Sequence, residues 1–169
     1  MKKFIEFILE IFNTKSYKWI KSEFTFRTQA YFKTKSNKEY YLCIDEISPN
    51  VYNIHFYYEK DGNKIITLDK SGDEYEVLGN IKNAIYDFIY SNEYRSEYLE
   101  FIGYSSFESE RNALYVMFLK HISSNNFISY WKKIGNNYYY FLKSKSLPDD
   151  IINRYEEMFI KYDKKNKYY

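Results

Sequence analysis

Regular alternation of aromatic and polar side chains predicts a β-rich first part of the chain. In residues 23–28 (Glu-Phe-Thr-Phe-Arg-Thr) the aromatic residues recur with the period of a strand that has one buried face. Residues 39–46 and 51–59 read as two further strands, and residues 61–63 (Asp-Gly-Asn) are of types that tolerate the positive φ of a hairpin turn. A strand at residues 65–68 would complete an antiparallel meander.

A helical period of apolar residues follows the meander. Asp73 and Glu76 have the spacing of a capping box, in which the first and fourth side chains satisfy each other's free backbone N–H groups. The apolar residues on one face of this helix are Val77, Ile81, Ile85, Phe88 and Ile89. A second capping pattern, from Ser105 to Glu108, predicts another helix. Its core stripe would be Leu114, Phe118 and Ile122.

The remaining segments are two helices, a strand and a hairpin. We expect a helix at residues 2–12, a strand at residues 98–104, and a hairpin formed by residues 127–133 and 137–143. Residues 146–148 (Ser-Leu-Pro) open a last helix, because Ser favours the cap and Pro the first helical turn. The inward residues of that helix would be Ile151, Ile152, Tyr155, Phe159 and Tyr162.

The order of these elements indicates the fold class. A run of strands followed by mixed helices is typical of an α+β fold. We therefore predict a single domain, residues 1–162, in which a mainly antiparallel sheet combines the N-terminal meander with the later hairpin and helices pack on one face. Residues 163–169 are expected to form a frayed basic tail.

The composition is dominated by a few residue types. The chain has 22 Tyr and 14 Phe among 169 residues, and Lys, Asn and Ile are also abundant. All five types have AT-rich codons, so an AT-rich genome explains the aromatic excess more simply than a function that depends on aromatic rings. Residue types that carry chemistry are scarce, with one Cys, two His and four Arg. This scarcity argues against most classes of enzyme.

Few combinations of residues could carry catalysis. A Cys–His nucleophile would need Cys43 beside His55 or His121, yet Cys43 lies between Leu42 and Ile44 in a predicted strand, where it reads as a small buried apolar residue. The single cysteine cannot form an internal disulfide. The sequence has neither zinc-ligand spacing nor a glycine-rich phosphate loop, so we expect no cofactor.

A metal-dependent nuclease is a third functional hypothesis. Asp45, Glu46, Glu59 and Lys60 are similar to the acid–acid–lysine arrangement of small nucleases. However, Glu59 and Lys60 are adjacent on a predicted strand, so their side chains would point to opposite faces of the sheet. We therefore predict no enzyme and no metal-binding residue.

Charge is unevenly distributed although the net charge is only +2. Seven basic residues and one acid lie in residues 15–38, ten acids and four bases in residues 69–111, and ten bases and five acids in residues 112–169. Helix caps and exposed helix faces account for the acidic stretch, because carboxylates are favoured near helix N-termini.

Two basic stretches also contain aromatic residues, including both tryptophans. Lysines that follow a phosphate backbone and rings that stack on bases are ingredients of single-strand binding, and the same residue types suit a protein interface. A solvated strand surface would give the same pattern, since charged faces are usually only solvated. The candidate residues for binding nucleic acid or a partner are Lys15, Lys18, Trp19, Lys21, Arg27, Lys33, Tyr130, Trp131, Lys132, Lys133, Lys143 and Lys145.

Residues 105–115 (Ser-Ser-Phe-Glu-Ser-Glu-Arg-Asn-Ala-Leu-Tyr) follow a predicted strand. A strand that ends in Ser, followed by a helix with Arg-x-x-Leu-Tyr, resembles small uncharacterised α+β proteins of bacteriophages and mobile elements, anti-CRISPR-type inhibitors among them. The resemblance covers residues 73–122, rests on no specific family motif and carries over no functional residue. It implies a protein that acts in the cytoplasm of a bacterial host by binding host machinery, without catalysis.

The function expected from the sequence is therefore that of a non-enzymatic phage-type accessory protein. It would bind a host protein or ribonucleoprotein through its basic and aromatic surface and inhibit nucleic-acid-handling defence machinery, as a monomer or a small homo-oligomer. Direct binding of single-stranded RNA or DNA is the alternative. We expect no membrane partner, because Glu6 and Glu10 interrupt the apolar N-terminal run and no apolar window is long enough to span a bilayer.

Overall fold

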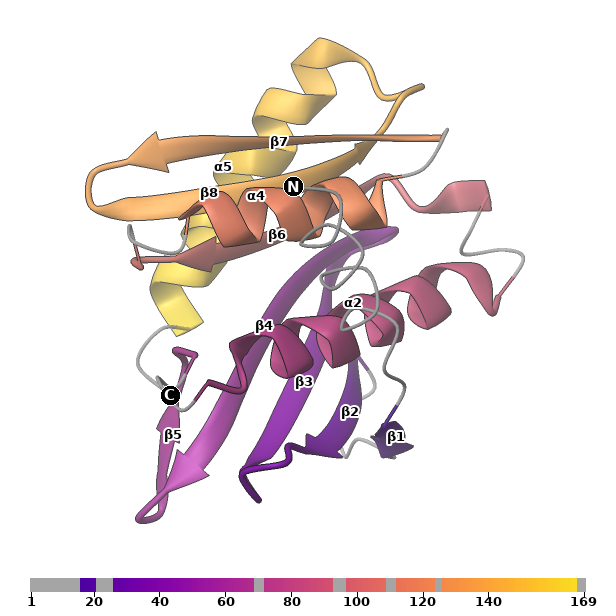
Figure 1. Ribbon diagram of the computed structural model, residues 1–169. Coiled ribbons are helices and arrows are strands. Elements are labelled where there is room, and N and C mark those ends of the chain that lie inside the picture. Colours follow the sequence, from indigo (N-terminus) through magenta and orange to yellow (C-terminus); the bar gives the residue numbers. More distant parts are fainter. Residues whose placement is uncertain are drawn as a thin grey trace, which may run out of the picture. The chain divides into compact units, whose positions relative to one another are not determined.

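Eight strands and three helices make up the described part of the chain in the computed structural model (Figure 1). The structure describes residues 16–20, 26–68, 72–92, 97–108, 112–123 and 126–166. The strands are β1 (Tyr17–Ile20), β2 (Arg27–Lys33), β3 (Glu39–Ser48), β4 (Val51–Lys60), β5 (Asn63–Ile65), β6 (Phe101–Ser106), β7 (Phe127–Ile134) and β8 (Asn137–Ser144). The helices are α2 (Glu74–Tyr90), α4 (Asn112–Ile122) and α5 (Asp149–Asn166).

The strands form a mostly antiparallel sheet in the order β1-β2-β3-β4-β6-β8-β7, with β5 paired to β4. The predicted α+β fold with a mainly antiparallel sheet is confirmed. The chain divides into two compact units. Unit 1 comprises residues 1–43 and 55–92, and unit 2 comprises residues 44–54 and 93–169.

The meander from β2 to β5 agrees with the strands expected from the sequence, except at its ends. β3 and β4 include the strands expected at residues 39–46 and 51–59. Asp61 and Gly62 both have positive φ and form a two-residue turn, so β5 begins at Asn63, two residues before the strand that we expected at residues 65–68.

The N-terminal elements differ more from the expectation. The helix expected at residues 2–12 and residues 23–25 of the first expected strand lie outside the described residues. The strand begins at Arg27 and continues to Lys33, beyond the predicted end at residue 28. β1 was not predicted, because Tyr17-Lys18-Trp19-Ile20 is too short to show a strand period.

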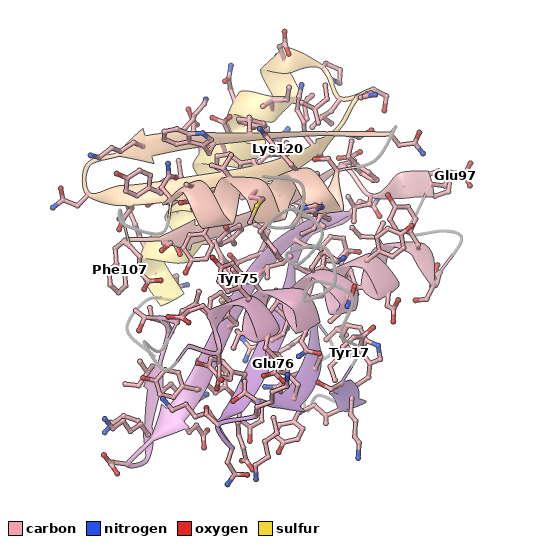
Figure 2. All side chains as sticks on the ribbon, in the orientation of Figure 1. Tyr17, Tyr75, Glu76, Glu97, Phe107 and Lys120 are labelled. Carbon is pink, nitrogen blue, oxygen red and sulfur yellow. The ribbon has the colours of Figure 1, made fainter. Side chains whose placement is uncertain are left out.

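Helix α2 packs on one face of the unit 1 sheet. The predicted apolar stripe from Val77 to Ile89 is buried throughout. In the β1–β2 register Tyr17 is opposite Phe32, and the hydroxyl of Tyr17 donates to the backbone carbonyl of Asn83 and to a carboxylate oxygen of Asp87 on α2 (Figure 2). Burial, and then the bond to Asp87, raise the pKa of Tyr17. The hydrogen bonds of Tyr17 therefore connect β1 to α2.

The predicted capping box at the start of α2 is wrong. Asp73 is the N-cap residue but its side chain makes no cap hydrogen bond. It accepts a hydrogen bond from the hydroxyl of Ser36 instead, while Oε2 of Glu76 accepts one from the backbone N–H of Lys35 at 3.2 Å. Both acids therefore tie the β2–β3 turn to the beginning of the helix, a long-range role that the local spacing does not reveal.

Unit 2 is built around β6. This strand pairs in parallel with β4, where Val51 is opposite Phe101, and antiparallel with β8. β8 pairs antiparallel with β7 over eight residue pairs, which confirms the predicted hairpin.

Helices cover both faces of the β6–β8 part of unit 2, which corrects the expectation that helices pack on one face (Figure 1). Gly103 on β6 lies against the ring of Phe159 on α5. Its neighbour Tyr104 points to the other face, where its ring contacts Tyr115 and Phe118 on α4. Adjacent residues of one strand thus pack against different helices.

The predicted helix start at Ser105–Glu108 is also wrong. β6 continues through Ser106, so it is displaced from the strand expected at residues 98–104, and α4 begins at Asn112. The hydroxyl of Ser105 donates to Asp163 on α5 at 2.6 Å, and the Ser106 hydroxyl accepts the N–H of Glu108 at 3.1 Å. Leu114 lies in α4, but its side chain is outside the described residues.

The last helix extends further than expected. α5 runs to Asn166, so four residues of the stretch 163–169 that we expected to be a tail are helical. The other three lie outside the described residues. Lys164 and Lys165 in the last turn favour this continuation, since cations are stabilising at a helix C-terminus.

Candidate binding surface

The first basic segment does not form one surface. In the β1–β2 register Lys18 is opposite Tyr31 and Trp19 is opposite Ala30, so the side chains of Lys18 and Trp19 lie on opposite faces of the sheet. Trp19 is 42% exposed and its ring makes an edge contact with Tyr17. Lys15 and Lys21 lie outside the described residues.

The other cations of this segment have neighbours within unit 1. Nζ of Lys33 lies 3.6 Å from a carboxylate oxygen of Glu39. Arg27 is half-buried on β2. Unit 1 therefore presents Trp19 and Lys18 as separate exposed features rather than as a basic groove.

A row of tyrosines crosses β2, β3 and β4 on one face of unit 1. The ring centroids of Tyr31 and Tyr41 are 5.5 Å apart, and those of Tyr41 and Tyr57 are 5.1 Å apart and nearly parallel. Nζ of Lys64 lies 4.8 Å from the centroid of Tyr57. Partial burial, and then hydrogen bonding to Glu39, raise the pKa of Tyr31.

This row was missed by sequence reasoning, because its members come from three strands that only the sheet brings together. Its charge is mixed. Burial, and then the nearby carboxylates of Glu59 and Glu39, raise the pKa of Tyr41. Because Glu39 and Glu59 lie near its rings, the row does not favour a phosphate backbone.

The second basic segment is the β7–β8 hairpin of unit 2. Gly135, with φ +61°, occupies the first position of the two-residue turn between Ile134 and Asn137, where glycine is preferred because the φ is positive. Residues opposite each other in the register share a face of the sheet. Consequently Tyr130 and Lys132 lie on the α5 face and Trp131 and Lys133 on the α4 face.

Tyr130 and Lys132 both contact Glu156 on α5. Nζ of Lys132 lies 2.6 Å from Oε2 of Glu156 on α5, and the hydroxyl of Tyr130 donates to Oε1 of the same carboxylate at 2.8 Å. Glu156 is only 7% exposed. Burial, and then the bond to Glu156, raise the pKa of Tyr130. These two candidate residues hold α5 to the hairpin.

Trp131 and Lys133 are exposed on the α4 face of the hairpin. Trp131 is 43% exposed, and its ring centroid lies 5.9 Å from that of Tyr138. Nζ of Lys133 lies 5.4 Å from the centroid of Tyr138, a cation–π contact. Lys120, in the last turn of α4, is exposed as well (Figure 2). We call Trp131, Lys133 and Tyr138 the hairpin cluster.

The last two candidates of this segment differ in exposure. The side chain of Lys143 is 15% exposed, and its Nζ lies 3.9 Å from the fully exposed Asp149. Lys145 is exposed, and its backbone N–H donates to the carbonyl of Asn126. Residues 127–145 contain four lysines and neither Asp nor Glu, but Lys132 and Lys143 lie beside Glu156 and Asp149 of α5, so the local positive charge rests on Lys133 and Lys145.

The residues considered for catalysis are dispersed. Cys43 is fully buried on β3 and lies 3.5 Å from Nε2 of Gln29. Asp45 is buried in unit 2, where it accepts a hydrogen bond from the hydroxyl of Tyr162, whereas Glu59 and Lys60 belong to unit 1. Among the residues that the structure describes, no group of three or more His, Cys, Asp or Glu side chains is placed to hold a metal ion.

Comparison of the chain with protein-family models, with curated proteins and with solved structures gives no match. Within the described ranges, no helix has the length and apolar character needed to cross a membrane. The exposed surfaces of the two units are therefore the basis for a functional proposal.

Proposed function

We propose that this protein is a non-enzymatic binding protein whose main contact surface is the hairpin cluster on β7 and β8. Its partner is a host protein or ribonucleoprotein that handles nucleic acid, and binding blocks that activity, as in the phage-type inhibitors that residues 105–115 resemble. The observation that carries the proposal is the exposure of Trp131, which is 43% exposed on a fully paired strand although its ring contacts Tyr138.

Large aromatic side chains dominate the energetics of protein interfaces when they are held rigidly and become buried on binding. Trp131 meets the first condition, because the register of all eight β7–β8 pairs and its contact with Tyr138 restrict its position. Lys133 adds a cation next to the ring. Together they suit a partner surface that offers an apolar pocket bordered by negative charge.

The two tryptophans provide a matched test of this proposal. Trp19 and Trp131 are 42% and 43% exposed, and they lie in different units. The intact protein is immobilised and proteins from a bacterial lysate that it retains are identified, purified and titrated against each variant. Trp131→Ala should weaken binding by about 30-fold or more, since an interface anchor contributes about 2 kcal/mol or more. Trp19→Ala should leave the affinity within about twofold. An interaction that responds equally to both variants, or to neither, contradicts the proposal.

Direct binding of single-stranded RNA or DNA is a second candidate, and the local charge of the hairpin favours it. Lys133 and Lys145 are exposed and, unlike Lys132 and Lys143, do not lie beside Glu156 or Asp149, so they would attract a phosphate backbone. In that case affinity for labelled oligonucleotides should fall steeply with salt, and Lys133→Glu should weaken binding to all sequences alike. Binding that ignores salt, or no binding at low salt, rejects this candidate.

A further inference from the structure

We propose that β7 accepts an added β-strand, and that the occupant is an extended segment of a partner protein in which apolar and acidic residues alternate. This inference rests on the proposed function, which identifies the hairpin as the contact surface. It adds the conformation and the charge of the segment that binds there.

The backbone of β7 is paired on one side. β8 occupies that side through eight residue pairs, and in the strand order of the described residues β7 is the last strand (Figure 1). A terminal strand leaves backbone N–H and C=O groups without sheet partners along its outer edge, and these groups can pair with another extended chain.

The turn indicates which residues present these groups. A two-residue hairpin turn closes on a hydrogen-bonded pair, here Ile134 and Asn137. Hydrogen-bonded and non-hydrogen-bonded pairs alternate along an antiparallel ladder. Counting back from Ile134, the outward N–H and C=O groups belong to Lys133, Trp131 and Ser129. These three residues form the outer edge of β7.

Most devices that protect a natural sheet edge are missing from β7. Such devices include a very short strand, a proline, a bulge or an edge lysine. β7 has eight residues, contains no proline and keeps an unbroken register with β8. It does carry two lysines: Lys132 is bonded to Glu156 on the α5 face, and Lys133, on the α4 face, is the lysine whose own N–H and C=O groups lie on the outer edge.

The side chains along β7 favour an alternating occupant. On the α5 face Ile128 and Ile134 are exposed, and on the α4 face Lys133 is exposed next to Trp131. An added strand would place every second side chain on each face. Apolar residues would then cover the two isoleucines, and acidic residues would lie opposite Lys133. A second copy of this chain fits less well, because its β7 contains neither Asp nor Glu that could lie opposite Lys133.

The test uses the full chain and two synthetic peptides of about eight residues, one alternating Val and Glu and the other alternating Val and Lys. Binding is followed by NMR through the backbone amides. We expect the Val/Glu peptide to shift the β7 amides and, at saturation, to slow hydrogen exchange of Ser129, Trp131 and Lys133 by about tenfold or more. The Val/Lys peptide should leave them unchanged. No effect of the Val/Glu peptide, or equal effects of both peptides, overturns the proposal.

A proline substitution at Ser129 tests whether the peptide binds through backbone hydrogen bonds or only through side-chain contacts. The N–H of Ser129 points away from β8, so Ser129→Pro removes an outward donor without breaking the β7–β8 ladder. Ser129→Pro should abolish binding of the Val/Glu peptide, whereas Ser129→Ala should retain it. Lys133→Pro gives the same comparison if Ser129→Pro does not fold. Retained binding in a folded proline variant overturns strand addition.

Two outcomes distinguish this inference from the function on which it rests. If a captured partner is lost with Trp131→Ala but kept with Ser129→Pro, the hairpin is a binding surface and strand addition is wrong. If labelled oligouridine binds Ser129→Ala and Ser129→Pro equally well while the Val/Glu peptide does not bind, the hairpin recognises phosphate, and the acidic segment is overturned as its occupant.

Discussion

The Nζ atom of Lys132 lies 2.6 Å from Oε2 of the buried Glu156, whereas the adjacent Lys133 points to the opposite face of β7 and lies over the ring of Tyr138. Two neighbouring lysines therefore have different roles. Lys132 bonds a buried carboxylate of α5, and Lys133 contacts an aromatic ring on the other face.

Replacing each of these lysines should separate the two roles. Lys132→Ala leaves Glu156 with Tyr130 as its remaining described partner and should lower the free energy of unfolding by about 1–2 kcal/mol, a value limited because Lys132 itself is partly exposed. Lys133→Ala should change it by less than about 0.5 kcal/mol. Urea denaturation of both variants measures the difference. Equal effects would show that the contact with Glu156 contributes nothing to stability.

The close approach of β6 and α5 predicts a steric effect at Gly103. A Cβ atom at this position would lie 2.7 Å from two ring carbons of Phe159, which is fully buried. Gly103→Ala should therefore destabilise the protein by about 1–3 kcal/mol, the usual cost of overpacking a core. In a Phe159→Leu background the same change should cost clearly less, and thermal or urea unfolding of the double-mutant cycle checks this. Strict additivity would rule out the clash as the cause.

The contact between Tyr155 on α5 and Glu100 predicts a loss of stability at alkaline pH. Burial, and then the hydrogen bond to Glu100, raise the pKa of Tyr155 to about 12. Because this pKa is raised in the folded state, the contribution of Tyr155 is complete below the ordinary value of 10 and is lost as the pH rises towards 12. The stability difference between the native protein and Tyr155→Phe should be constant up to about pH 9 and then fall. A difference that stays constant to pH 12 would contradict the assignment.

Asp73 predicts the opposite dependence at acidic pH. Its burial acts to raise the pKa, but hydrogen bonds from Ser36 and Thr34 outweigh this effect and lower it from the ordinary value of 3.8. A lowered pKa contributes stability above 3.8, which is lost as the pH falls through the folded-state value. Asp73→Asn should therefore be less stable than the native protein at neutral pH and should approach it in acid. Ser36→Ala, which removes the main donor, should weaken this pH dependence; unchanged pH dependence in Ser36→Ala would assign the shift to another group.

Elements with a strong local period could be predicted from the sequence. The strands expected at residues 39–46 and 51–59 and the apolar helical stripe from Val77 to Ile89 rest on local signals of this kind, and the structure has these elements. The hairpin about Gly135 was predictable for a similar reason, since its turn residues separate two runs of strand-forming residues.

Elements that depend on distant partners could not be predicted. Ser105 resembles a helix cap in the sequence, but its hydroxyl bonds Asp163, 58 residues later in the chain. The acids that were expected to cap helices or to lie on exposed helix faces include Glu108 and Asp87, which accept hydrogen bonds from the hydroxyls of Tyr115 and Tyr17. Some carboxylates of the acidic stretch therefore accept hydrogen bonds from tyrosine hydroxyls. No local spacing in the sequence predicts these tyrosine–carboxylate pairs.

The candidate surface was predictable only as a set of residue types. The sequence identifies Tyr130, Trp131, Lys132 and Lys133 together, and the strand period divides them between two faces. The face of β7 that meets Glu156 depends on the packing of α5, so only the fold distinguishes the lysine bonded to Glu156 from the lysine over Tyr138.

The position of the tryptophans has a practical consequence for the study of folding. The chain contains two tryptophans, and each compact unit holds one of them on a strand. Both indole rings are partly covered, at 42% and 43% exposure, so the fluorescence of each should respond to loss of its own surroundings. Trp19→Phe keeps only the tryptophan of unit 2, and Trp131→Phe keeps only that of unit 1. The tryptophan fluorescence of each variant therefore reports on one unit. Coincident denaturation curves from the two reporters would mean that the units unfold as one cooperative system, and separated curves would give each unit a stability of its own.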